Sequence, residues 1–308
     1  VEDIPGTALH EGIDWEWETF PEFLNAIERK EFVMDLGFMI GHGPVRSYVM
    51  GYDRCQNQVD ASKDEINQMS EIVEKAINAG ALGFSTSRTI LHRDVHGVYV
   101  PGTEASSEEM KELAFAVDRA GEGTLEIVSD WLDQEIEMSW MKEYVEKSDC
   151  GLTVLQTNGD SVKTILYCEE QFLKGKNVRP QFPGRNVGLM FGLESSLHPF
   201  IGHPSYKEIS HFPLEERLTI MRDPAFKQKI LNESPSFRED LQKAAKEQKS
   251  NKTKEEIKAE AEMGKKLISN YETQFILSDP PNYEPTREDS IAYLAEQRNQ
   301  TEEEVIYD

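Results

Sequence analysis

Apolar residues along the first two thirds of the chain follow two alternating patterns. In one, they recur every three or four positions, as Phe20, Phe23, Leu24 and Ile27 do, which is typical of an amphipathic helix. In the other, they form short runs between turn residues, which is typical of a strand. The predicted helices span Glu18–Arg29, Ser62–Asn78, Ser106–Arg119, Gln134–Lys147 and Ser161–Lys174. The predicted strands span Phe32–Ile40, Ala81–Phe84, Thr124–Val128, Leu152–Gln156 and Val178–Phe182.

Strands that alternate with helices in this way pair in parallel through right-handed crossovers. The fold class is therefore α/β. Five such units in a row favour a (β/α)8 barrel of the TIM type over a three-layer Rossmann sheet, and the sequence lacks the GxGxxG fingerprint of the latter. A closed barrel needs eight strands, whereas the sequence supports five or six. Because proteins avoid unpaired sheet edges, either other segments complete the sheet or the chain is part of a larger protein.

The pattern changes in the last third of the chain. Short helices are predicted over Pro213–Met221 and Pro224–Leu231, a last strand over Gln274–Leu277 and a capped helix over Thr286–Gln297. Between them, Ser236–Lys266 is almost wholly Lys, Glu, Asp, Gln and Ala, which fits either a solvated helix or a flexible insert. The predicted organisation is a central barrel part at 1–235, a charged helical insert or linker at 236–268, and a late barrel segment at 269–308.

The composition narrows the class of partner. Fifty-seven acidic residues against 33 basic ones give a formal charge of −24. This charge argues against nucleic acid or an anionic membrane surface, which need clustered cations, and favours a small-molecule substrate. No apolar run approaches the roughly 20 residues that span a bilayer. Three cysteines without CxxC spacing indicate a reduced, cytoplasmic setting.

Polar residues after the strand Ala81–Phe84 are the first candidates for a site. In α/β units the residues past the carboxyl end of a strand face the site. The hydroxyl of Ser85 can orient a substrate amide, and Arg88 can hold a substrate carboxylate. The alternative is that the serine caps the loop and that Arg88 is merely exposed.

Two further residues follow the strand that is predicted to end at Gly41. His42 lies between glycines that allow the backbone a close approach to a ligand, and Arg46 can clamp a carboxylate with its planar fork. A structural histidine and a surface ion pair are the alternatives. Arg185, in the QFPGR stretch, and His198 and His203, each followed by proline, are expected to shape a lid or pocket wall and to contact substrate.

Several segments resemble the N-acyl-D-amino-acid deacylase branch of the amidohydrolase superfamily (amidohydrolase family 3). They include GALGFSTSR with PGT behind it, GHGPVRSYVMG, SLHPFIGHPSYKEI and YEPTREDSIAYLAEQRNQTEEEVIYD. The resemblance implies a (β/α)8 barrel with a small β-sandwich beside it, and a zinc ion that activates water for attack on an amide. It also implies that this chain is a central fragment that lacks the first and last barrel strands.

The chain lacks several of the residues that bind zinc in this family. It contains no HxH or HxDxH pair, so the first-strand ligands and the eighth-strand Asp are expected outside it. The family's Ser-His at the fifth strand end aligns with Ser129-Asp130, and Gln156 stands where a His is usual. Asp130 and Glu126 are the remaining candidate metal ligands, by oxygen. The alternative is that they are ordinary solvated carboxylates.

The resemblance thus implies a metal-dependent amidohydrolase that cleaves an N-acyl amino acid or a similar amide, with this chain inactive alone. A second hypothesis is a non-catalytic relative that binds a carboxylate-bearing small molecule through Arg46, Arg88 or Arg185. A third is a scaffold that acts through Ser236–Lys266.

Overall fold

The computed structural model describes residues 6–94, 98–131, 133–156, 162–184, 188–195, 197–236 and 254–308. The chain divides into two compact units. The first comprises Val1–Val187 with Gln248–Ser250, and the second comprises Gly188–Glu247 with Asn251–Asp308. Among the described helices, none is both long and apolar enough to cross a membrane.

A five-stranded sheet forms the centre of the first unit, and all its pairings are parallel. Its strands are β1 (Ile40–Gly41), β2 (Gly83–Arg88), β3 (Thr124–Ser129), β4 (Gly151–Leu155) and β5 (Val178–Gln181). They lie side by side in chain order. A consecutive order without a reversal is that of a barrel arc, whereas a doubly wound sheet reverses at a switch point. The α/β class is confirmed, and the closed eight-stranded barrel stays a prediction.

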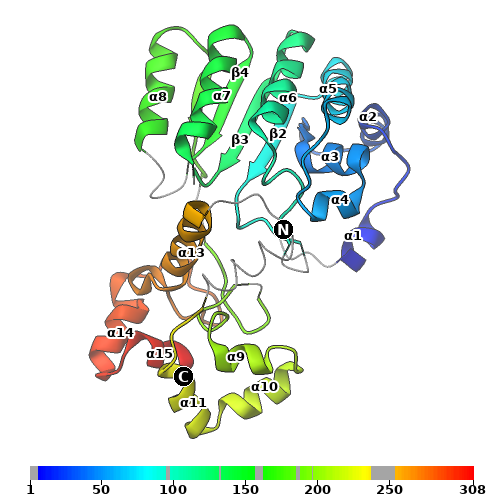
Figure 1. Ribbon diagram of the computed structural model, residues 1–308. Helices are drawn as coiled ribbons and strands as arrows, with labels where there is room; N and C mark the ends of the chain where they lie inside the picture. The colour runs from blue at the N-terminus through cyan, green and yellow to red at the C-terminus, as the bar shows by residue number, and fades with distance from the viewer. Residues whose placement is uncertain are drawn as a thin grey trace. The chain divides into compact units, whose positions relative to one another are not determined.

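Helices connect the strands and cover the sheet on one side (Figure 1). The connecting helices are α3 (His42–Met50), α4 (Tyr52–Gln56), α5 (Lys63–Asn78), α6 (Ser107–Ala120), α7 (Gln134–Lys147) and α8 (Val162–Leu173). Helices α1 (Gly6–Gly12) and α2 (Phe20–Glu28) precede the first strand. Helix α6 packs between α5 and α7. The core lies between this helix layer and the sheet, where Phe84, Leu125 and Leu152 are fully buried.

The predicted helices of this unit are confirmed to within about two residues at each end. Ser62 and Glu65 form a capping box at the start of α5, and Ser106 caps α6. Strand β2 begins two residues later than predicted and continues to Arg88. The predicted strand Phe32–Ile40 is wrong, because only Ile40–Gly41 pairs with β2. Several apolar residues before it are exposed, Val33 and Met34 among them, and no strand of the described residues pairs with this segment.

The second unit is helical over its described residues. Its elements are α9 (Pro204–Ile209), α10 (Leu214–Met221), α11 (Pro224–Leu231), α13 (Lys254–Ile268), η1 (Tyr271–Thr273), η2 (Arg287–Asp289), α14 (Ile291–Arg298) and α15 (Glu302–Tyr307). Small clusters around Ile230 and around Ile291 form its cores. The predicted strand Gln274–Leu277 is wrong: only Phe275 forms an isolated bridge, with Ser290.

The charged segment is helical where it is described, in α13, whereas 237–253 lies outside the described residues. The predicted domain boundaries after residues 235 and 268 therefore stay predictions.

Candidate functional site

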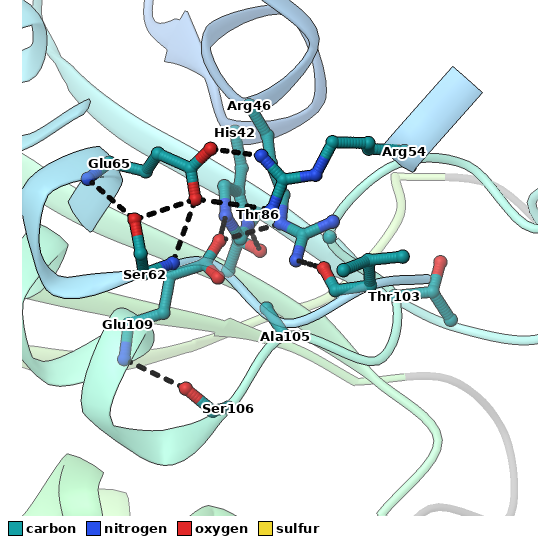
Figure 2. Close-up of polar contacts among 12 residues, drawn as sticks. His42, Arg46, Arg54, Ser62, Glu65, Thr86, Thr103, Ala105, Ser106 and Glu109 are labelled. Atoms are coloured by element: carbon teal, nitrogen blue, oxygen red, sulfur yellow. Dashed lines mark hydrogen bonds and ion pairs between the residues drawn. The ribbon is translucent and has the colours of Figure 1, made fainter. Parts of the chain in front are cut away.

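A buried polar cluster joins the carboxyl ends of β1 and β2 to helix α6 (Figure 2). His42, the first residue of α3, lies 2.7 Å from Glu109 Oε1 through Nε2 and 2.9 Å from Thr86 Oγ1 through Nδ1. Arg46, one turn further along α3, donates from Nε to the same Glu109 oxygen at 2.9 Å. The His42, Arg46 and Glu109 side chains are at most 2% exposed.

The charges within this cluster balance. Burial alone would raise the pKa of Glu109, but the hydrogen bonds and charges of His42 and Arg46 outweigh it and hold that pKa below its usual value. Burial lowers the pKa of His42. Glu109 is therefore an anion, Arg46 a cation and His42 neutral. Because an ionised carboxylate only accepts hydrogen bonds, His42 carries its proton on Nε2, and Thr86 donates to Nδ1.

A glycine closes the cluster on the loop side. Gly102 has φ +99°, and a Cβ on it would lie 2.7 Å from His42 Nδ1. This position therefore requires glycine both for its backbone conformation and for the close approach of the loop to the imidazole.

A second buried ion pair adjoins the first. Arg88, the last residue of β2, donates to Glu137 of α7 from Nε at 2.8 Å and pairs with it through Nη2 at 2.7 Å. Its Nη1 donates to the backbone oxygens of Ala105, at 2.9 Å, and Gly102, at 3.4 Å. Arg88 is thus bound on all three nitrogens by groups of the protein.

These contacts follow from the side-chain alternation along β2. Phe84, Thr86 and Arg88 point to the helix layer, where their partners lie. The roles that the sequence suggests for His42, Arg46 and Arg88 in binding substrate stay predictions. In this structure His42 and Arg46 bind Glu109, and Arg88 binds Glu137.

Ser85 points the other way, to the face of the sheet opposite the helices. In register, it pairs with Glu126 of β3, and Glu126 pairs with Thr153 of β4. We call the surface that carries these three half-buried side chains the Ser85 face. Ser87 lies on the same face, and its Oγ is 2.6 Å from Nδ1 of His92.

The candidate metal ligands Asp130 and Glu126 are not gathered into a metal centre. Asp130 Oδ2 accepts a hydrogen bond from the backbone amide of Ile90 at 2.6 Å. Over the described residues, no group of three or more His, Cys, Asp or Glu side chains is placed to hold a metal ion. The described side chains therefore do not fit a zinc site.

The other predicted residues belong elsewhere. His198 and His203 are buried in the second unit, where they contact Tyr206 and Phe200 respectively. Arg185 lies outside the described residues.

Sequence reasoning missed the acidic partners of the buried arginines. Neither Glu109 nor Glu137 was identified from the sequence as the partner of an arginine. A signal existed for the partner Thr86: strict alternation from the apolar Phe84 places Thr86 and Arg88 on the same buried face. The pairing of Arg88 with Glu137, 49 positions away, depends on the packing of α7.

No family model matches the chain. It is 29% identical to D-aminoacylase of Alcaligenes xylosoxydans xylosoxydans over 109 residues, which is 35% of this chain and 20% of that protein. It is 30% identical to an uncharacterized protein of Mycobacterium tuberculosis over 70 residues, 22% of this chain and 12% of that one. The chain thus spans about a fifth or less of these relatives.

One solved structure is similar over part of the fold. It is N-acyl-D-glutamate deacylase from Bordetella bronchiseptica, crystallised with zinc and a phosphonate that mimics the tetrahedral intermediate. The TM-score is 0.41 with 17% sequence identity, over 53% of this chain and 33% of that one. The 109-residue match to D-aminoacylase, and not this structural likeness, is the evidence of homology, and the resemblance to the deacylase branch of the amidohydrolases is confirmed for that part of the chain.

Proposed function

We propose that the protein is an amidohydrolase that acts on the amide of an N-acyl amino acid. The observation that carries this proposal is the 109-residue homology to D-aminoacylase, whose name states that reaction class. The consecutive parallel strands support it, because such sheets place reactive groups at their carboxyl ends.

The Ser85 face supplies groups suited to an amide. The Ser85 hydroxyl can donate a hydrogen bond to the carbonyl oxygen, and the Glu126 carboxylate can accept a proton from an attacking water. The buried pairs behind β2 support this role, because Thr86 and Arg88 are fixed to α3 and α7 and thereby hold the intervening strand residues in place.

Zinc would lower the pKa of a bound water and polarise the carbonyl in a deacylase of this class. The described side chains do not form its site. We therefore propose that the 308 residues alone retain no zinc and bind an N-acyl amino acid without appreciable turnover.

The experiment measures binding and turnover on the 308-residue protein. Isothermal titration is run with a panel of N-acetyl-D-amino acids, their L enantiomers and the methylphosphonamidate analogue of each ligand that binds. Release of free amino acid and zinc content are measured in parallel. Ser85 and Glu126 are proposed to face the tetrahedral intermediate of the whole enzyme, and such a site binds a tetrahedral analogue more tightly than the substrate even where it does not complete the reaction. We therefore expect at least a tenfold preference for the phosphonamidate.

The outcomes separate the hypotheses. Binding of the amide without this preference favours the non-catalytic carboxylate binder, and binding of neither ligand refutes both proposals. Turnover, or bound zinc, would show that the chain is active or metal-loaded by itself. Glu126→Gln should weaken phosphonamidate binding, whereas Glu122→Gln, an exposed residue before the same strand, should not.

A further inference from the structure

Arg217, in helix α10 of the second unit, is a buried cation without a carboxylate partner. Only 8% of the residue is exposed. Its Nη1 donates to the hydroxyl of Tyr206 at 2.7 Å and to the backbone oxygen of Leu193. Both acceptors are neutral, and no carboxylate of the described residues forms an ion pair with Arg217.

The guanidinium has one edge without partners. Its buried Nε makes no hydrogen bond, and Nη2 makes none to any described residue. The Nε and Nη2 hydrogens form the fork with which arginine binds carboxylate or phosphate through two parallel hydrogen bonds. The edge of the guanidinium that has no partner is therefore the one with which arginine binds an oxyanion.

One imidazole, that of His198, lies near this guanidinium, and a second, that of His203, lies near the first. The ring of His198 packs edge-on against Tyr206, with centroids 4.5 Å apart, and the charge of Arg217 acts on it. Burial lowers the pKa of His198 to about 4. His203 is 8% exposed, and its Nδ1 has no hydrogen-bond partner. Glu233 accepts hydrogen bonds from the amide and hydroxyl of Ser205.

A buried charge without a counter-ion costs several kcal/mol. The contrast with the first unit is direct, because the buried Arg46 and the half-buried Arg88 each bind a glutamate. We propose that Arg217 is the core of an anion site, which takes a small oxyanion, a carboxylate or a phosphate, on its Nε/Nη2 edge beside His198. This inference does not require that the protein hydrolyses amides.

The test uses the full 308-residue chain with inorganic phosphate, acetate and N-acetyl-D-glutamate as separate probes. Isothermal titration should show saturable binding of at least one probe, and the ranking of the three identifies phosphate or carboxylate as the preferred group. Arg217→Met should weaken that binding at least tenfold. Arg222→Met, an exposed arginine at the end of the same helix, should leave it within twofold.

A second measurement does not depend on the folding of the variant. In 15N spectra of arginine Nε–H groups, the Arg217 resonance should shift with the same saturation curve as the calorimetric binding. If no probe binds, if the Arg217→Met protein binds as wild type does, or if the Arg217 Nε resonance does not move, the anion site is refuted. Phosphate and acetate are not amides, so this result is separate from the outcome of the hydrolysis assay.

Discussion

Replacement of Glu109 by alanine is the sharpest test of the buried cluster. Glu109 Oε1 accepts hydrogen bonds from His42 and Arg46, and the Glu109 side chain is fully buried. The alanine variant removes the anion and leaves the Arg46 guanidinium inside the protein, where its Nη2 keeps only the backbone oxygen of Val59, at 2.7 Å. The main cost is thus the uncompensated charge, and the lost hydrogen bonds add to it.

The structure sets the size of the effect. Removal of one partner of a buried ion pair destabilises a protein by about 3–5 kcal/mol, and we expect Glu109→Ala to fall in that range. The matched control is Glu108→Ala, because Glu108 is the preceding residue of α6, is exposed, and has a carboxylate oxygen 4.0 Å from Lys63 Nζ. It should cost less than about 1 kcal/mol, as is usual for surface pairs. The double variant Arg46→Met/Glu109→Leu should cost less than the sum of Arg46→Met and Glu109→Leu measured singly, because it leaves neither charge unpaired.

Urea unfolding followed by tryptophan fluorescence provides the assay. Trp15, Trp17, Trp131 and Trp140, the four tryptophans of the chain, belong to the first unit, so the signal reports on the unit that contains Glu109. If Glu109→Ala and Glu108→Ala unfold at the same urea concentration as wild type, the cluster does not hold α3 to α6 as described, and the assignment of charges is wrong.

Two further predictions concern the same unit. Burial lowers the pKa of His42 in the folded state, so below about pH 6.5 the unfolded chain binds a proton at His42 that the folded chain does not. The free energy of unfolding should therefore fall as the pH falls through that value, by up to about 1.4 kcal/mol per pH unit. Urea midpoints measured from pH 8 to 5 check this, and His42→Gln should reduce the dependence on pH. Gly83 has φ +153°, and a Cβ on it would overlap the backbone oxygen of Thr124, so Gly83→Ala should cost at least about 2 kcal/mol by the same assay. Gly175→Ala is its control, because Gly175 has φ +84° but open space around it, and this change should cost about 1 kcal/mol. An equal loss of unfolding free energy in the two variants would contradict the close approach of β2 and β3.

Local signals in the sequence predicted most elements of the first unit. The capping box at Ser62 and Glu65 and the cap at Ser106 are interactions within one turn, so the residues that form them are adjacent in the sequence. The predictions at Phe32–Ile40 and Gln274–Leu277 were wrong because a strand also needs a neighbouring strand to pair with. Apolar residues there remain exposed, for example Met34 and Leu277.

The candidate site could be predicted only in part. Arg88 was correctly placed at the end of a strand, but whether its fork meets a ligand or a glutamate depends on α7, which begins 46 positions later. The surroundings of Arg217 could not be predicted from the sequence, because its neutral partners, Tyr206 and Leu193, meet it only through the packing of the second unit.

The chain-order arrangement of the strands bears on how the first unit reaches its fold. Each pairing, from Ile40 with Phe84 to Leu152 with Val178, joins a strand to its immediate successor, so every loop to be closed is a single crossover. The closure entropies of the longest and shortest of these loops differ by only about 0.5 kcal/mol. The sheet can therefore grow one strand at a time in the direction of synthesis, and Phe84, Leu125 and Leu152 can be covered as soon as the helix that follows each has emerged from the ribosome.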